Sequence, residues 1–324
     1  MVWGPVILVM VIIIGIIWLT RPVATEQREI SQAPVRDLTE YDVTRADGQL
    51  VACQPWDIGT GVRGYHWPVP HPKAVLLLQH GYAEYATRYV HEYNQVIRHL
   101  LERDISVYAF DLWGHGFSDG IRGVVDVRAA VADHITAREQ LADVTVPVFL
   151  YGHSLGGFIT VSSVVRQPAQ VAGVILTSPA IPHQPPRLFM RMANLLARFW
   201  PNSHAPIPSA PVDGLSRDEV FIQRATDDPL IYHGELTNLV GATALEVAAQ
   251  NDAHYPEWEA PVLLLHGDGD TWADVRGTQR FAEIVEDDDT TLVIYPDGRH
   301  QLLSDTDRDQ VLHDILTWLN RRMA

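Results

Sequence analysis

The chain has 324 residues, of which 47% are hydrophobic and 20% are charged, proportions typical of a globular protein rather than a disordered or fibrous one. Its formal net charge of -16 argues against nucleic acid as a partner, because affinity for phosphate backbones comes largely from Lys and Arg contacts. Lys73 is the only lysine and Cys53 the only cysteine, so no disulfide can form within the chain and a lysine-based mechanism has one candidate residue.

Residues 1–20 are predicted to form a transmembrane anchor. The run MVWGPVILVMVIIIGIIWL carries no charged side chain, and at a rise of about 1.5 Å per residue it nearly spans a hydrocarbon core of about 30 Å. The alternative is a cleaved signal peptide, but no basic residue precedes the run, and the TRPVATEQ that follows lacks a small-x-small cleavage site.

The orientation and the tether follow from the next residues. Three arginines follow the apolar run and none precedes it, so the positive-inside rule predicts a single-pass membrane protein whose folded body is cytoplasmic. Residues 21–36 are polar and contain two prolines, which is typical of a short linker.

Residues 37–181 are predicted to be the first part of a core of strands and helices. Alternating apolar residues around the Asp-Gly pair at 47–48 predict an antiparallel hairpin. Longer amphipathic stretches then separate six short apolar runs: AVLLLQ (74–79), ISVYAF (105–110), VPVFLY (146–151), VAGVILT (171–177), APVLLLH (260–266) and TLVIY (291–295). This alternation is typical of a mainly parallel sheet covered by helices on both faces.

Between residues 182 and 250 the alternation of strands and helices stops, and we predict an inserted helical cap, after which residues 251–324 complete the core. The segment 187–200 predicts an amphipathic helix, whose apolar stripe comprises Leu188, Met192, Leu195, Leu196 and Phe199. The simpler interpretation is a helix packed on its own domain. The alternative is a cap helix that touches lipid or lines an acyl tunnel.

A candidate nucleophile lies where a predicted strand turns into a helix. The run at 146–151 leads through GHSLG (152–156) into a helical segment, which is the context that a G-x-S-x-G nucleophile turn requires. Its glycines remove side chains that would collide in so tight a turn and leave the Ser154 hydroxyl exposed. A serine hydroxyl is a poor nucleophile at neutral pH, so it needs a nearby base and an acid that orients the base.

Two later strand ends can supply the acid and the base. In a nucleophile turn of this type the acid and then the histidine follow the serine in the chain, and APVLLLHGDGD ends with Asp270 while TLVIYPDGRH ends with His300. Both lie at the carboxyl edge of the predicted sheet, where ligands of open α/β sheets bind. Asp268 and Asp274 compete with Asp270 as the acid. The three carboxylates lack the spacing of a calcium loop, and we predict no metal and no cofactor.

Acyl transfer also needs backbone N–H donors that stabilise the oxyanion, one just after the nucleophile and one after an earlier strand. Leu155 follows the serine, and Tyr82 follows His-Gly at the end of AVLLLQ. We therefore predict that the amides of Tyr82 and Leu155 form the oxyanion hole. His153 and His266 are interpreted as hydrogen-bonded structural groups rather than as second bases.

Taken together, these motifs resemble those of the monoacylglycerol lipase and lysophospholipase branch (serine aminopeptidase S33-like) of the α/β-hydrolases, over residues 37–322. HGYAEYATRY (80–89) is similar to the family's H-G-x-G-E-H-x-x-R-Y loop, and DLWGHGFSDG (111–120) is similar to its D-x-x-G-H-G-x-S-x-G segment. GHSLGG (152–157) is similar to the family's G-H-S-x-G-G, and GDGD (267–270) is similar to its G-x-x-D. The resemblance implies an α/β-hydrolase fold with an inserted helical cap, here behind an N-terminal transmembrane helix.

The resemblance also implies a serine hydrolase that cleaves carboxylic esters of monoacyl lipids, monoacylglycerol or lysophospholipid, through an acyl-enzyme intermediate. It implies that Glu84 and Arg88 hold the alcohol head group, the alternative being an ion pair that braces the loop. The chain departs from the family pattern at Ala83 and Tyr85, where the pattern has Gly and His, and this concerns the head group rather than ester cleavage.

Two other functions fit the same scaffold. One is acyl transfer to an alcohol, and the other is noncatalytic lipid binding by a membrane-anchored protein, because a fold does not fix a function. The expected partners are a lipid ester and, through the N-terminal helix, the membrane.

Overall fold

The computed structural model describes residues 37–169, 171–182, 186–206, 210–285 and 289–323. The predicted anchor (1–20) and linker (21–36) lie outside these described residues. Within the described ranges no helix is both long enough and apolar enough to cross a membrane.

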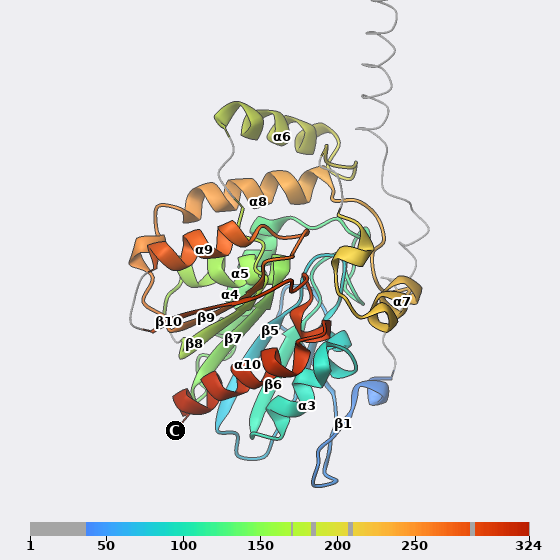
Figure 1. Ribbon diagram of the computed structural model, residues 1–324, viewed down its shortest axis with the longest axis vertical. Helices are drawn as coiled ribbons and strands as arrows, with labels where there is room; N and C mark the ends of the chain where they lie inside the picture. Colours follow the sequence, from blue (N-terminus) through green and yellow to red (C-terminus); the bar gives the residue numbers. More distant parts are fainter. Residues whose placement is uncertain (1–36, 170, 183–185, 207–209, 286–288, 324) are drawn as a thin grey trace, which may run out of the picture.

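An eight-stranded sheet forms the centre of the molecule (Figure 1). Its order is β10-β9-β8-β7-β5-β6-β4-β3; the strands from β10 to β6 are parallel, whereas β4 and β3 are antiparallel to their neighbours. The strands are β3 (Gln54–Trp56), β4 (Gly64–Trp67), β5 (Ala74–Gln79), β6 (Ile105–Phe110), β7 (Val148–His153), β8 (Gly173–Thr177), β9 (Val262–Gly267) and β10 (Thr290–Tyr295). The predicted hairpin is a separate antiparallel pair, β1 (Val43–Thr44) and β2 (Leu50–Val51).

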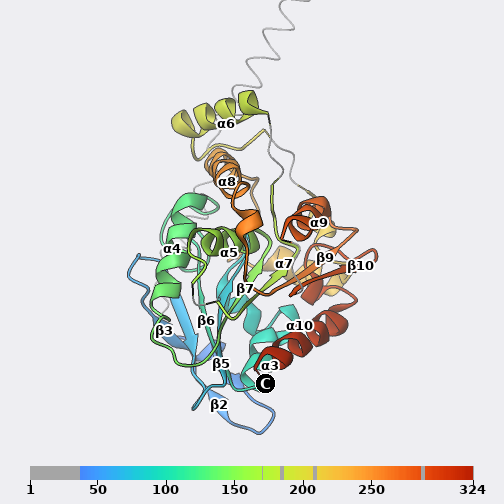
Figure 2. The same ribbon diagram turned by 90° about the vertical axis from the view of Figure 1, so that its left-hand side faces the viewer.

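Helices cover both faces of the sheet (Figures 1 and 2). One face is covered by α3 (Val96–Leu101) and α10 (Arg308–Met323), and the other by α4 (Val127–Glu139), α5 (Ser154–Arg166), α8 (Asn238–Asn251) and α9 (Val275–Ile284). This arrangement confirms the predicted α/β-hydrolase fold.

The apolar runs of the sequence follow from burial on two sides. In β5, Leu76 and Leu78 belong to the core that includes α3 and α10, whereas Val75 and Leu77 belong to the core that includes α4 and α5. Every residue of a strand between two helical layers is buried, so the strand reads as a continuous apolar run. All six runs predicted as strands form β5 to β10.

Four strand starts differ from the prediction. Strands β7, β8 and β9 begin two residues later than expected and β10 begins one residue earlier. Strands β7 and β9 start directly after Pro147 and Pro261. A proline has no backbone N–H to donate to a sheet, and here both prolines contribute only their carbonyl oxygens, to Val75 and Val174.

In the described part of the chain, three α-helices lie between β8 and β9: α6 (Arg187–Phe199), α7 (Glu219–Asp227) and α8. Helix α8 packs against α4 and α5 of the core, and α6 packs on the outer side of α8 (Figures 1 and 2).

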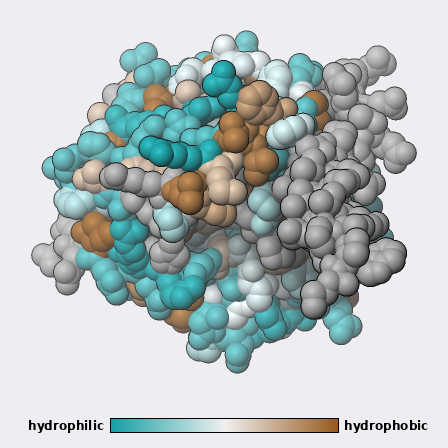
Figure 3. Space-filling model, turned by 90° about the horizontal axis from the view of Figure 1, so that it is seen from above, coloured by the Kyte–Doolittle hydropathy of each residue, from teal (hydrophilic) through white to brown (hydrophobic). Residues whose placement is uncertain are grey.

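The apolar stripe predicted for α6 is mostly exposed, so the interpretation of a helix packed on its own domain is wrong for most of the stripe. The exposed fractions are Leu188 70%, Met192 57%, Leu195 56% and Phe199 61%. Helix α6 packs mainly against α8, and Leu196 is the half-buried residue of the stripe. Figure 3 views the molecule from this side and shows apolar side chains gathered among hydrophilic ones.

Three of the buried histidines have strongly lowered pKa values. Burial lowers the pKa of His115 and of His134 to about 3, and that of His153 to about 4. In the unfolded chain they titrate near the ordinary histidine pKa of about 6.5. The unfolded state therefore binds more protons than the folded state between about pH 6.5 and pH 4, and the free energy of unfolding falls as the pH falls through this window.

We expect these three histidines to lower the free energy of unfolding by about 4 kcal/mol between pH 7.5 and pH 5.5, measured by urea denaturation. Substituting His134→Leu is expected to remove about a third of this pH dependence. His254→Gln is the control, because the His254 side chain is 55% exposed and should leave the pH dependence as it is. A pH dependence that His134→Leu does not change would contradict the assignment.

Candidate active site

Ser154 lies at the junction between β7 and α5, as the first residue of the helix. Its φ of 53° is in the left-handed region, which residues with a side chain rarely adopt. The turn is packed tightly against the end of β5, since a Cβ atom added to Gly156 would lie 2.2 Å from the carbonyl oxygen of His80. This packing holds the strained turn in place.

The structure brings Ser154, His300 and Asp270 into one chain of hydrogen bonds. His300 Nε2 lies 2.9 Å from Ser154 Oγ, and His300 Nδ1 lies 2.7 Å from Asp270 Oδ2. Because an ionised carboxylate can only accept, His300 carries its proton on Nδ1. Nε2 is then free to accept the proton of the Ser154 hydroxyl.

Asp270 is held by four donors at the end of β9. Its Oδ2 accepts from His300 and from His266 Nε2 at 3.1 Å, and its Oδ1 accepts from the amides of Trp272 at 2.7 Å and Ala273 at 3.0 Å. Burial opposes ionisation, but the charge of His300 and the hydrogen bonds from His266 and His300 hold the Asp270 pKa well below its usual range. The carboxylate is therefore ionised and fixed in orientation at neutral pH.

The two other histidines near the site have structural partners. His266 Nδ1 bonds Thr278 Oγ1 at 2.7 Å, so His266 links Asp270 to α9. His153 Nδ1 lies 3.0 Å from the carbonyl oxygen of Thr177, and burial keeps its imidazole neutral at pH 7.

The competing carboxylates have other partners. Asp268 accepts from the amide of Asp297 at 2.6 Å, and Asp274 caps α9 by accepting from the amide of Arg276 at 3.0 Å. Throughout the described residues no group of three or more His, Cys, Asp or Glu side chains could hold a metal ion.

The loop after β5 runs directly alongside the nucleophile. A Cβ atom added to Gly81 would lie 2.9 Å from Ser154 Cβ, so the next residue, Tyr82, is close to the serine. The Tyr82 hydroxyl donates to the carbonyl oxygen of Gly123 at 2.7 Å, which fixes the loop. Tyr82 and Leu155 both line a cavity with Ser154, as two oxyanion donors would.

Glu84 is bound by protein groups although it also lines a cavity. It is 3% exposed, and it accepts hydrogen bonds from the Gly81 amide at 2.5 Å, from the Tyr89 hydroxyl at 3.0 Å and from the Tyr93 hydroxyl. Burial raises its pKa, but the neighbouring His153 and other groups outweigh burial and lower it. Its ionised carboxylate braces the loop that carries Tyr82.

Arg88 connects the same loop to the segment between β8 and β9. Its Nε lies 3.7 Å from Asp228 Oδ2, and its guanidinium lies 5.0 Å from the ring centre of Phe221 in α7. Tyr85, one of the two departures from the family pattern, donates its hydroxyl to the same Asp228 at 2.8 Å. In the structure both Glu84 and Arg88 have protein partners, and their contact with a head group stays a prediction.

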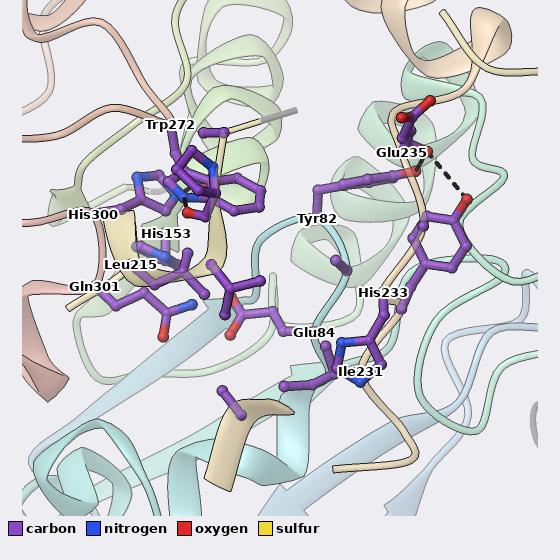
Figure 4. Close-up of a pocket in the computed structure, with 18 of the residues that line it drawn as sticks. Tyr82, Glu84, His153, Leu215, Ile231, His233, Glu235, Trp272, His300 and Gln301 are labelled. Atoms are coloured by element: carbon purple, nitrogen blue, oxygen red, sulfur yellow. Dashed lines mark hydrogen bonds between the residues drawn. The ribbon is translucent and has the colours of Figure 1, made fainter. Parts of the chain in front are cut away.

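Two cavities meet at Ser154. The first, of about 360 Å³, is called the polar cavity because its lining includes Glu84, Arg88, His233, Glu235 and Gln301. Figure 4 shows His300, His153 and Trp272 on one side of it and Tyr82, His233 and Glu235 on the other.

The second cavity, of about 400 Å³, is called the apolar cavity. Among the described residues that line it none is charged, and it includes Leu155, Ala180, Leu236, Val240, Gly241 and Ala244. Ser154, Tyr82, Tyr232 and Trp272 line both cavities. A substrate with one polar and one apolar end can therefore lie across the serine.

Several lining residues were not predicted from the sequence. Trp272 and Gln301 stand within two residues of Asp270 and His300, and this proximity is a signal that could have found them. Tyr232, His233 and Glu235 lie between α7 and α8, where no periodic pattern relates the sequence to the site.

Three kinds of comparison with known proteins give consistent matches. The family model described as serine aminopeptidase, S33, matches residues 70–307. Monoglyceride lipase of Rattus norvegicus is 33% identical over 316 residues, covering 94% of this chain and 97% of the relative, and that of Homo sapiens is 30% identical over 315 residues, covering 93% and 96%. The solved structure of Paleococcus ferrophilus monoacylglycerol lipase has a TM-score of 0.71 at 26% identity, covering 81% of this chain and 99% of that chain.

The S33 model covers most of the chain, and the two mammalian relatives match it almost from end to end. Together with the sheet order and the nucleophile turn, these matches establish the family. The chain belongs to the serine aminopeptidase S33 family of α/β-hydrolases and is similar to monoglyceride lipases.

Proposed function

We propose that the protein is a serine hydrolase that cleaves the carboxylic ester of a monoacyl lipid, with monoacylglycerol as its preferred substrate. The observation that carries the proposal is the hydrogen-bonded chain of Ser154, His300 and Asp270 at the junction of a polar and an apolar cavity. The names of the relatives, monoglyceride lipase and monoacylglycerol lipase, support the substrate class.

The geometry supports a two-step mechanism. Ser154 Oγ attacks the ester carbonyl carbon while His300 Nε2 takes the hydroxyl proton, and the amides of Tyr82 and Leu155 stabilise the oxyanion. The ester C–O bond then breaks, and His300 gives its proton to the leaving alcohol. Water attacks the acyl-enzyme as His300 takes a water proton, and the fatty acid leaves as that proton returns to Ser154.

The cavities orient the substrate across the serine. An acyl chain fits the apolar cavity because no charged group among its described lining residues is desolvated by the chain. The glycerol hydroxyls then lie in the polar cavity, where Glu235 and His233 offer hydrogen-bonding groups. A second acyl chain would have to lie against the same charged groups, which favours a monoacyl ester.

The charges also favour glycerol over a phosphorylated head group. The guanidinium of Arg88 is already matched by Asp228, while Glu84 and Glu235 add carboxylates to the polar cavity. The phosphate of a lysophospholipid would be repelled by these carboxylates, so monoacylglycerol is the better of the two predicted substrates.

We further infer the roles of the remaining parts of the chain. Residues 182–250 act as the cap over the site, with Asp228 joining it to Arg88, while 37–181 and 251–324 form the hydrolase core. On the sequence alone, residues 1–20 anchor the enzyme in the membrane, residues 21–36 link the anchor to the core, and the catalytic domain faces the cytoplasm.

Replacing Glu84 by glutamine is expected to lower the free energy of unfolding by about 2 kcal/mol and to lower kcat with little change in KM. The new amide NH₂ group would face N–H and O–H donors from which the carboxylate now accepts hydrogen bonds. The loop that carries Tyr82 would lose these hydrogen bonds. Urea denaturation and steady-state kinetics measure the two effects.

Glu92→Gln is the control for this substitution. Glu92 pairs with Arg224, whose side chain is 53% exposed, so its loss should cost less than about 1 kcal/mol and leave kcat unchanged. A Glu84→Gln variant with normal kcat would show that Glu84 does not position the oxyanion loop.

The proposed function is tested by measuring fatty acid release by the full-length protein. Monooleoylglycerol is compared with dioleoylglycerol and with oleoyl lysophosphatidylcholine, with and without an added alcohol acceptor, and the protein is incubated with a fluorophosphonate probe. Rapid hydrolysis of monooleoylglycerol and covalent labelling support the proposal. Esters formed with the added alcohol would indicate an acyltransferase, whereas a folded protein that is inert to every ester and to the probe would indicate noncatalytic lipid binding.

A further inference from the structure

A small apolar crevice lies between α6 and α8, next to the apolar cavity. Its volume is about 60 Å³, and the described residues that line it carry no charge; they include Ala193, Leu196, Ala205, Gly241, Ala242 and Leu245. The side-chain amide of Asn238, its one polar side chain in this part of the structure, donates to the carbonyl oxygen of Trp200 at 3.0 Å. The crevice is therefore suited to hydrocarbon.

Gly241 is the residue that the crevice and the apolar cavity share. Successive helix residues are about 100° apart around the axis, and Val240 and Ala244 line the apolar cavity while Ala242 and Leu245 line the crevice. Gly241 comes between these two faces of α8.

The space beside Gly241 lies between a wall of the apolar cavity and a wall of the crevice. A Cβ atom added there would lie 3.7 Å from Leu236 Cδ2, a wall of the apolar cavity, and 3.9 Å from Ala205 Cβ, a wall of the crevice. Glycine is unfavourable in a helix interior, but at Gly241 it leaves the space between these two walls open. A longer side chain at residue 241 would fill the space between the apolar cavity and the crevice.

We propose that Gly241 determines which acyl chain lengths the enzyme accepts, because the end of a long chain passes over Gly241 from the apolar cavity into the crevice between α6 and α8. This inference rests on the proposed function, and it adds a second binding site for the distal methylenes of a long acyl chain. Short chains end in the apolar cavity and do not enter the crevice.

The test compares the hydrolysis of monoacylglycerols with acyl chains of 8, 12, 16 and 18 carbons by the full-length protein and by Gly241→Leu. The ratio of kcat/KM for 18 carbons to that for 8 carbons is expected to fall at least tenfold, since each methylene that loses its apolar contact costs about a fourfold factor. Gly241→Ala, whose methyl group makes only ordinary contacts, should lower the ratio less.

Two further variants separate this effect from a folding defect. Ala193→Leu fills the crevice from α6 without touching the core, and it should lower the same ratio for the longest chains. Ala249→Leu adds the same side chain to α8, but Ala249 lines neither hollow, so it should leave the ratio unchanged. Thermal denaturation of each variant reports on folding.

The outcomes distinguish this inference from the function on which it rests. A fall in the ratio of kcat/KM for 18 carbons to that for 8 carbons in both Gly241→Leu and Ala193→Leu supports the passage. An unchanged chain-length profile in these two folded variants would overturn it and leave ester hydrolysis intact. A wild-type protein inert to every chain length would overturn the proposed function, and the passage with it.

Discussion

Replacing Ser154 by alanine is expected to lower kcat/KM for monoacylglycerol by roughly 10⁴- to 10⁶-fold, the range seen when the nucleophile of a serine hydrolase is removed. His300 Nε2 now lies 2.9 Å from Ser154 Oγ, and in the variant it would have no hydroxyl from which to take a proton. Residual hydrolysis would come from substrate binding and the oxyanion amides alone. KM should change little, because the cavities remain.

Fatty acid release and fluorophosphonate labelling measure this loss, with Ser178→Ala as the matched control. Ser178 follows β8 at the same edge of the sheet, and its buried hydroxyl has no hydrogen-bond partner in the described part of the chain. The control should keep at least half of the wild-type rate and full labelling. A Ser154→Ala protein that is folded and still hydrolyses monoacylglycerol within tenfold of the wild type would refute the assignment of the nucleophile.

The strands of the core could be predicted because burial on both faces leaves a direct trace in the sequence. In β5 every residue from Ala74 to Leu78 is buried and apolar, so no exposed polar position interrupts the run before the strand ends at Gln79. Since parallel strands end at one edge of the sheet, the same pattern also predicted that Ser154, Asp270 and His300 would be neighbours.

The details around Glu84 could not be predicted in the same way. One of its three hydrogen bonds comes from Tyr93, which begins a run of three residues with positive φ, from Tyr93 at 52° to Gln95 at 50°. Residues other than glycine rarely adopt this conformation, and nothing in their identity indicates it here. Sequence therefore predicted a polar residue near the site, but it could not decide whether its carboxylate faces the substrate or the loop.

Helix α6 shows a similar limit. Its amphipathic pattern correctly predicted a helix, because the 3.6-residue period is a local property. Which side is buried depends on the partner, and α8 presents small residues, Gly241 and Ala242, to one narrow side of α6. The stripe from Leu188 to Phe199 is consequently mostly exposed, and only the packed structure could show it.

Replacing Asp270 by asparagine is expected to lower kcat/KM by about 10⁴-fold, as for other triads in which the acid loses its charge. The aspartate oxygens now accept from the amides of Trp272 and Ala273 on one side and from His266 and His300 on the other. Asparagine has one oxygen and one NH₂ group, so it can serve only one of these two pairs.

The backbone amides of Trp272 and Ala273 cannot turn away, so they should continue to donate to the oxygen of the asparagine side chain. The NH₂ group then faces His300 Nδ1, which must become an acceptor, and the imidazole proton moves to Nε2. In that tautomer Nε2 donates to Ser154 and cannot remove its proton. The loss therefore falls on kcat and on the rate of fluorophosphonate labelling rather than on KM.

Asp268→Asn is the matched control, since it removes the same charge from the same loop. Asp268 accepts from the amide of Asp297, an interaction that the asparagine oxygen can keep, so kcat/KM should stay within threefold of the wild type. The Asp270 pKa is held well below its usual range by His300 and His266, so the wild-type carboxylate is ionised throughout pH 5 to 9. The defect of Asp270→Asn should consequently persist across that range, and a variant that recovers activity at higher pH would place the orienting charge on another residue.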